Sequence, residues 1–325
     1  MTGKPVTGKP AAGRSATAAE PSYDELPVLP GTDIRHAWEV WPDRTLGTLN
    51  RLTPERRLAA LAEAVEGECI DLTLPLDQPD PPLYGRPRFE HRVHALRPSM
   101  IDDEFVHLNP QASSQWDALR HFGAGRNGFF GGVEAWDSPQ AVELGIHTWL
   151  TVGVVTRGVL LDLPRFWQAS GQAVDAFEER AITVDELEST AELMGARPGP
   201  GDVILLRTGW VDQMRRDGFP SEHLAMPVGV GLHAGPDMAR YLWDAGVFAV
   251  AADNPAVEVL PGDPAVGSLH RRCLAGLGLP FGELWDLESL AAWSVRSQRA
   301  TCCVVSVPLH VPGGVASPAN AMALV

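Results

Sequence analysis

Short apolar runs separated by capped or amphipathic segments are the feature of this sequence that most constrains its fold. A short apolar run bounded by turn residues is typical of a buried strand, and a segment that opens on a capping residue is typical of a helix. Helices are expected over 54–66, 183–194 and 236–245, and strands over 68–75, 148–155, 158–163, 203–208, 247–252 and 302–307. Some strands follow one another directly and others alternate with helices, which favours a layered α/β or α+β domain over a pure βαβ repeat.

The first helix and the 146–163 segment each carry a more specific expectation. The first helix should bury one stripe, made of Leu58, Leu61, Ala62 and Val65. Thr156 and Arg157 should form the tight connection between the two strands of the 146–163 segment.

The chain has 325 residues, of which 45% are hydrophobic, so it can bury a sizeable core in one large domain or two. Residues 1–27 are rich in Gly, Pro, Ala, Thr and Lys and cannot bury enough apolar surface to offset their ordering entropy. We therefore expect a disordered tail over 1–27 and a single domain over 28–325.

The charge balance argues against two classes of partner. The chain carries 41 acidic and 26 basic side chains, a formal charge of −15, whereas nucleic acids and anionic membranes select clustered positive charge. No apolar run is long enough to span a bilayer, and the start of the chain lacks the apolar stretch of a secretory signal. Four irregularly spaced cysteines do not make a disulfide framework. A cytoplasmic location is expected.

Polar side chains crowd the segment 109–122, with almost no hydrophobic periodicity to explain them. Gln111, Gln115 and Asp117 are separated by even numbers of residues, so on an extended chain they share one face. His121 follows four residues after Asp117 and comes within reach if the chain turns helical there. A carboxylate, two amide oxygens and an imidazole that converge suit a hard divalent cation.

An ordinary structural role is equally open for this segment. Asp117 could cap a helix and His121 could make a hydrogen bond in the core. His107 could supply a further imidazole ligand, although a strand histidine that faces solvent is the commoner outcome.

From about Leu46 onward the chain resembles the putative cyclase superfamily, which includes metal-dependent kynurenine formamidase and isatin hydrolase. The blocks that carry the resemblance are Gly47-Thr-Leu-Asn-Arg-Leu-Thr53, Gln115-Trp-Asp-Ala-Leu-Arg-His121, Arg157-Gly-Val-Leu-Leu-Asp162, Gly201-Asp-Val-Ile-Leu-Leu-Arg-Thr-Gly-Trp210, Ala252-Asp-Asn-Pro-Ala-Val-Glu258, His270 with Glu283-Leu284, and Gly313-Gly-Val-Ala-Ser-Pro318. The resemblance implies a swivelling β/β/α-type fold, an α/β (α+β) class with a central barrel-like mixed sheet flanked by helices. It also implies a homodimer or higher oligomer.

The family's metal motif, His-x-Gly-Thr-His-x-Asp-x-Pro-x-His, aligns with residues 111–121. Glutamine replaces histidine at two of its metal-binding positions. Its first two histidines are Gln111 and Gln115, whereas its aspartate and last histidine are kept as Asp117 and His121. The resemblance implies that Asp117 is a metal ligand, that His121 is the general acid/base, and that His270 and Glu283 join the site in members with two metals.

Glutamine can ligate through its amide oxygen, but it is a weaker ligand than imidazole. The exchange should lower the affinity for Zn²⁺ and shift the preference toward Mn²⁺ or Mg²⁺. The expected cofactor is one divalent ion of this group, Mn²⁺ or Zn²⁺, with Mg²⁺ as a further candidate.

These observations lead to one main hypothesis and two alternatives. The main one is a metal-dependent hydrolase of a small amide, lactam or ester, with His121 as general acid/base. Its metal ligands would come from Asp117, Gln111, Gln115, His270 and Glu283. The alternatives are a metal-independent cyclase, lyase or isomerase that uses His121 and Asp117 as an acid–base pair, and a catalytically silent homologue that binds a small molecule.

Two tryptophans are candidates for substrate contact. Trp116 lies inside the polar segment and Trp210 ends the block 201–210, so either could line an aromatic pocket. The expected partners are a small-molecule substrate and further copies of the chain.

Overall fold

A computed structural model describes residues 20–325 of the chain. A mixed sheet of nine strands lies at its centre, in the order β1-β13-β11-β5-β7-β9-β10-β4-β12. The strands are β1 (Cys69–Asp71), β4 (Gln115–Asp117), β5 (Val154–Asp162), β7 (Val203–Arg207), β9 (Ala249–Ala252), β10 (Phe281–Glu283), β11 (Thr301–Ser306), β12 (Ala316–Pro318) and β13 (Ala321–Leu324). β5, β7, β9 and β10 run parallel, and the strands on both sides of them are antiparallel.

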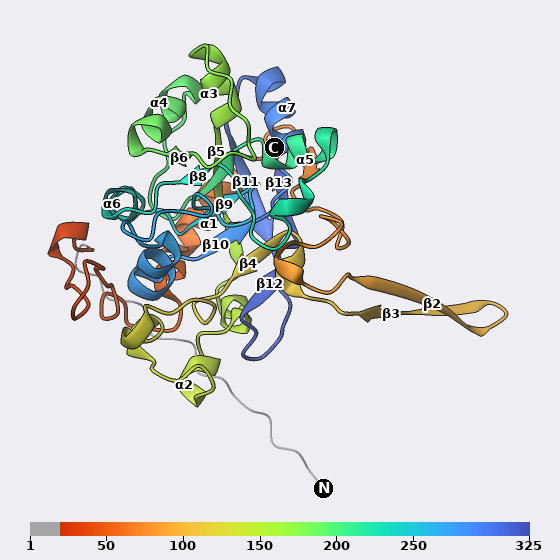
Figure 1. Ribbon diagram of the computed structural model, residues 1–325, viewed down its shortest axis with the longest axis horizontal. Coiled ribbons are helices and arrows are strands. Elements are labelled where there is room, and N and C mark those ends of the chain that lie inside the picture. Colours follow the sequence, from red (N-terminus) through yellow and green to blue (C-terminus); the bar gives the residue numbers. More distant parts are fainter. Residues whose placement is uncertain (1–19) are drawn as a thin grey trace, which may run out of the picture.

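Helices flank this curled sheet (Figure 1). The α-helices are α1 (Pro54–Leu61), α2 (Pro139–Val142), α3 (Leu163–Ala169), α4 (Val184–Met194), α5 (Trp210–Asp217), α6 (Pro236–Asp244) and α7 (Glu288–Ser297), and a π-helix, η9, spans Arg271–Leu277. The 3₁₀ helices are η1 (Tyr23–Glu25), η2 (Gly47–Arg51), η3 (Leu83–Gly85), η4 (Pro110–Ala112), η5 (Gly125–Asn127), η6 (Phe130–Gly132), η7 (Ile146–Thr151) and η8 (Ser221–His223). The expected fold class, a mixed α/β sheet with flanking helices, is confirmed.

Two large apolar clusters fill the two faces of the sheet. Val159 and Leu161 of β5 belong to one cluster, and Leu160 between them belongs to the other. Because successive side chains of a strand point to opposite faces, a strand that is apolar throughout needs cover on both sides. The helices supply that cover.

The helix expected over 183–194 is confirmed as α4, with its capping box. The Thr183 side chain accepts from the Glu186 backbone N–H, and the Glu186 carboxylate accepts from the Thr183 N–H. Gly195 ends the helix in the left-handed conformation that favours glycine.

The first helix corrects two expectations. α1 ends at Leu61, and the predicted buried stripe of Leu58, Leu61, Ala62 and Val65 is exposed. Ala60 is the buried residue, and Arg57 reaches the body of the protein by donating to the Val152 carbonyl. α1 therefore contacts the body through Ala60 and the Arg57 side chain, and its leucines are exposed.

The strands of the 146–163 segment also differ from expectation. Residues 146–151 form the 3₁₀ helix η7, and Thr156 and Arg157 lie inside the continuous strand β5 rather than in a turn. β5 pairs with β11 on one side and β7 on the other, and its polar residues find partners beside the sheet: Thr156 donates to the Gly201 carbonyl and Arg157 pairs with Asp202.

Residues 20–27, which were predicted to belong to the tail, are described by the structure. Residues 20–27 pack against the body, because Tyr23 and Leu26 are buried and Trp243 donates its indole N–H to the Pro21 carbonyl. The rest of the predicted tail lies outside the described residues.

A second sheet of two strands, β2 (Glu90–Arg97) and β3 (Met100–Val106), projects from the body as an arm (Figure 1). A third small sheet pairs β6 (Ala181–Ile182) with β8 (Gly231–Leu232). Over residues 20–325 no helix combines the length and the apolar character needed to cross a bilayer.

Candidate metal centre

The site forms where β4 pairs with β10, two strands that are far apart in the sequence. The antiparallel register sets Gln115 opposite Glu283 and Asp117 opposite Phe281. Directly opposed residues point to the same face, so Gln115, Asp117 and Glu283 share one face of the sheet. The Gln115 Nε2 donates to the Glu283 Oε2 at 2.6 Å, which fixes this pair in the core.

A tight turn after β4 returns His121 toward Asp117. The His121 backbone N–H donates to the Ala118 carbonyl at 2.8 Å, and the His121 Nε2 lies 3.8 Å from the Asp117 Oδ2. The predicted approach of His121 to Asp117 is therefore observed. The two side chains differ in exposure to solvent. The side chain of His121 is 27% exposed, whereas the side chain of Asp117 is fully buried.

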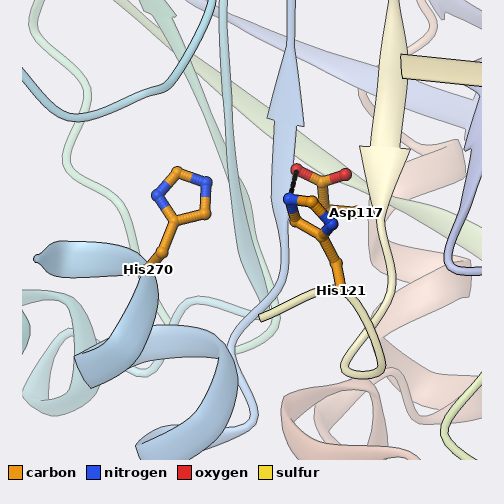
Figure 2. A group of neighbouring side chains, drawn as sticks. All are labelled: Asp117, His121 and His270. Carbon is orange, nitrogen blue, oxygen red and sulfur yellow. Dashed lines mark ion pairs between the residues drawn. The ribbon is translucent and has the colours of Figure 1, made fainter. Parts of the chain in front are cut away.

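His270 approaches from the opposite side, at the start of the π-helix η9 (Figure 2). One ligand atom each from Asp117, His121 and His270 lies within 4.8 Å of the other two. Two segments far apart in the sequence, β4 with the turn after it and the start of η9, thus place one carboxylate oxygen and two imidazole nitrogens around one point.

The ring of His270 is held between two carboxylates. Its Nδ1 lies 2.5 Å from the Glu258 Oε1 and its Nε2 lies 3.1 Å from the Glu283 Oε1. Glu258 is fixed in turn by the backbone N–H groups of Leu269 and His270. A carboxylate behind an imidazole orients the ring and raises its basicity.

Glu258 is a site residue that the sequence analysis did not identify. It ends the block 252–258, which was noted only as part of the family resemblance. The available signal was its acidic side chain directly after the three apolar residues 255–257.

Both glutamines of the motif lie in the site. The Gln111 Nε2 donates to the Asp117 Oδ1 at 3.1 Å and lies 2.9 Å from the His121 Nδ1. Gln115 contacts Glu283, as described above. All six predicted catalytic and metal-binding residues are therefore gathered in one place, with the glutamines making hydrogen bonds to the carboxylates.

Two buried oxygen atoms of β4 lack a hydrogen-bond donor among residues 20–325. They are the Gln115 Oε1 and the Asp117 Oδ2. Leaving a buried acceptor unpaired costs about 1–3 kcal/mol, and more for a charged group. Such atoms fit a site whose missing partner is a cation, since amide and carboxylate oxygens ligate hard divalent ions.

Burial and charge shift the pKa values of the site in different directions. Burial, followed by the nearby Glu283 carboxylate, raises the pKa of Asp117 to about 6. Burial lowers the pKa of His121, which favours its neutral form. Burial opposes charge on His270, but its hydrogen bonds to Glu258 and Glu283 outweigh that effect and raise its pKa well above the usual value.

Tyr84 and Arg86 lie beside the site, just before the arm. Arg86 donates to the Gln111 carbonyl and stacks its guanidinium 4.7 Å from the centre of the Tyr84 ring. Tyr84 has a left-handed backbone (φ 61°), a costly conformation for a large side chain. Gln111 follows the arm closely in sequence, so both ends of the arm run into the site.

Trp116 and Trp210, the predicted substrate contacts, are both buried. Trp116 is fully buried among Trp149, Phe248 and Trp285, on the opposite face of β4 from Asp117, and donates its indole N–H to Ser306. Trp210 is fully buried in a separate apolar cluster. Neither ring is exposed, and contact with substrate stays a prediction. His107, considered as a further ligand, is exposed.

The comparisons with known proteins agree with this architecture. The sequence profile of a family described as putative cyclase matches residues 70–259. A crystal structure described as a novel cyclase shares 29% identity, covers 89% of this chain and 99% of its own, and superposes with a TM-score of 0.78. No curated protein shows a significant sequence match to this chain.

Two isatin hydrolases share the fold at lower identity. Isatin hydrolase A from Labrenzia aggregata, bound to benzyl benzoate, is 17% identical, with a TM-score of 0.57 over 82% of this chain and 98% of its own. Isatin hydrolase A from Ralstonia solanacearum is also 17% identical, with a TM-score of 0.55 over 83% of this chain and 97% of its own.

The raised pKa of Asp117 predicts a pH-dependent stability. This pKa is about 6 in the folded protein and about 3.9 in an unfolded chain. The native state therefore holds a proton that the unfolded chain has lost, and the free energy of unfolding falls as pH rises from about 4 to about 6. Asp117→Asn should stabilise the metal-stripped protein at about pH 8 by at most about 3 kcal/mol, and little at about pH 4.

Thermal and urea unfolding at the two pH values measure this difference. Asp102→Asn, on the exposed arm, is the matched control and should change stability little at either pH. A loss of stability in Asp117→Asn at the higher pH, or the same gain at both, would contradict the prediction.

Proposed function

The chain belongs to the putative cyclase family, and on that premise we propose that it is a metal-dependent hydrolase of a small amide, lactam or ester. The observation that carries the proposal is the convergence of Asp117 and His121 with His270, which lies far from them in the sequence, with ligand atoms within 4.8 Å of one another. The isatin hydrolases that share the fold support hydrolysis as the class of reaction.

The donor set fits a divalent cation. Asp117, His270 and Glu283, with amide oxygens from Gln111 and Gln115, would hold the ion. A cation bound there would polarise the substrate carbonyl and lower the pKa of a bound water. Oxygen donors outnumber imidazole nitrogens in this set, so we infer Mn²⁺ as the preferred ion, with Zn²⁺ and Mg²⁺ as the ions to compare.

His121 is the proposed proton carrier. Its ring is partly exposed and so can face a substrate, while contacts with Gln111 and Asp117 fix its orientation. Its lowered pKa keeps it neutral at pH 7 and able to accept a proton. It would take the proton from the attacking water and return it to the leaving nitrogen or oxygen.

One observation favours a different function. Both glutamines donate hydrogen bonds to carboxylates, so the site satisfies much of its own charge without a cation. This supports the two alternatives: a metal-independent cyclase, lyase or isomerase that uses His121 and Asp117, and a silent binding protein. The metal-independent enzyme should keep its activity when metal is removed, whereas the silent protein should show no turnover with or without metal.

Removal of the metal is the direct test of the proposed function. Purified protein is assayed against a panel of small aryl amides, lactams and esters before and after treatment with a chelator. Hydrolysis should disappear with the metal and return on addition of Mn²⁺, because the carbonyl is no longer polarised without the ion. Full activity in a metal-free preparation would support the metal-independent alternative. No turnover with any ion would support the silent one.

Replacement of His121 tests the proton carrier. His121→Ala should lower kcat by roughly 10²- to 10⁴-fold at unchanged metal content, because proton transfer to and from water then lacks a positioned group. His94→Ala, an exposed histidine of the arm, is the control and should keep the wild-type rate. Wild-type turnover by a correctly folded His121→Ala protein would refute the role.

Restoring the imidazoles tests the effect of the glutamines. The double variant Gln111→His, Gln115→His should bind Zn²⁺ about tenfold or more tightly than the wild type, because nitrogen donors replace amide oxygens. Competition with a coloured zinc chelator measures the affinity. Gln140→His, which adds an exposed histidine on α2, controls for surface binding. An unchanged Zn²⁺ affinity would show that positions 111 and 115 do not face the ion.

A further inference from the structure

Two residues next to the carboxylates of the site have a left-handed backbone. Val257, directly before Glu258, has a φ of 57°, and Leu284, directly after Glu283, has a φ of 55°. This conformation is unfavourable for a branched or bulky side chain, so the surrounding structure must hold it. Glu258 and Glu283 contact the two ring nitrogens of His270. The groups that hold these two turns therefore also fix where both carboxylates lie.

The side chain of Asn254 holds the first turn. Its Oδ1 accepts from the Val257 backbone N–H at 2.8 Å, and its Nδ2 donates to the Val230 carbonyl at 2.7 Å. A longer donation from Nδ2, at 3.4 Å, reaches the Val257 carbonyl. Asn254 is buried, so water does not compete for these partners. An asparagine amide bonded to the nearby backbone stabilises a turn, and here it keeps Val257 in the left-handed conformation.

Strand β8 packs against the other side of the same turn. The Leu232 N–H donates to the Val257 carbonyl at 2.8 Å. Gly231 lies so close that a Cβ at this position would come within 2.3 Å of the Glu258 backbone. The Asn254 amide also donates to the residue that precedes β8, so it ties this strand to the turn. The backbone of Glu258 is thereby held on both sides.

The backbone of Asn254 holds the second turn. Its carbonyl accepts from the Leu284 N–H at 3.0 Å. The Ser114 hydroxyl donates to the Leu284 carbonyl and accepts from the Leu74 N–H. Both polar groups of the Leu284 backbone are thus bonded, which fixes the turn that directly follows Glu283. One residue therefore contacts the turns beside both carboxylates.

We propose that Asn254 is a positioning residue, which sets Glu258 and Glu283 against the two nitrogens of His270. The hydrogen bonds of its side chain all go to backbone groups, so it acts through the carboxylates rather than on a bound molecule. The consequence for metal binding rests on the proposed function, in which His270 and Glu283 help to hold the ion. Loss of a group that orients a metal ligand typically lowers metal affinity by roughly 10- to 100-fold.

Proton NMR of the metal-free full chain tests the positioning itself. A proton on the His270 Nδ1, bonded to the Glu258 carboxylate, should give a far-downfield signal that is absent from His270→Ala. Asn254→Ala should shift or broaden this signal, because the turn before Glu258 is no longer held. Asn254→Ser should change it less, since a serine hydroxyl keeps an acceptor for a backbone N–H.

Calorimetric titration with Mn²⁺ tests the consequence for the ion. Asn254→Ala should bind Mn²⁺ about tenfold more weakly than the wild type. Asn50→Ala is the matched control, because Asn50 also donates through its Nδ2 to two backbone carbonyls, those of Asp43 and Gly47, neither of which is a site residue. Asn50→Ala should lower thermal stability, as Asn254→Ala does, and change neither the NMR signal nor the Mn²⁺ affinity.

The two measurements separate this proposal from the proposed function. An unchanged signal in Asn254→Ala, an equal change in Asn50→Ala, or a wild type without the signal would overturn the positioning role. Mn²⁺ affinity that is the same in Asn254→Ala and the wild type would overturn it too. A wild type that binds no Mn²⁺ would contradict the proposed function, and the NMR signal would still decide the role of Asn254. Asn254→Ser carries the same comparison if Asn254→Ala does not fold.

Discussion

The pairing of β4 with β10 is the constraint on which the candidate site depends. It places Asp117 and Glu283 on one face of the sheet, buried and close enough that the Glu283 carboxylate helps to raise the pKa of Asp117. Buried carboxylates of like charge are costly unless cations or donors surround them. The surroundings meet this demand with the imidazole of His270 between Glu283 and Glu258, and with amide N–H groups from the two glutamines. A fold selected only for stability has no reason to gather three acids around one histidine.

The opposite face of β4 is closely packed. Trp116 points away from the carboxylates into a cluster of aromatic rings. Gly282 faces it across the ladder, where a Cβ would lie 2.6 Å from the Trp285 indole nitrogen. The close packing on this side leaves the short strand little freedom. The aromatic rings packed on this face therefore help to hold Asp117, on the other face of β4, in position.

The sequence predicted those parts of the molecule whose cause is local. The capping box of α4 and the apolar run of β7 depend on neighbouring residues, and both were found where expected. The exposed leucines of α1 and the unbroken strand β5 were missed, because the packing partners that decide them are distant in the chain. The site shows the same division. Spacing alone grouped Gln111 to His121, the family resemblance supplied His270 and Glu283, and Glu258 was found only once the fold placed it behind His270.

The exchange of two motif histidines for glutamines changes what the site must do to bind a cation. A neutral imidazole presents a nitrogen lone pair to the ion, whereas a glutamine amide presents either its oxygen or its N–H groups. Here the N–H groups of Gln111 and Gln115 are turned toward carboxylates. An incoming ion would exchange these hydrogen bonds for bonds to oxygen, and rotation of each amide would bring its Oε1 forward. The hydrogen bonds given up would count against the binding free energy, so this site should hold its ion more weakly than one built with imidazole at both positions. The orphaned Asp117 Oδ2 and Gln115 Oε1 limit that cost, since neither has a hydrogen bond from residues 20–325 to lose.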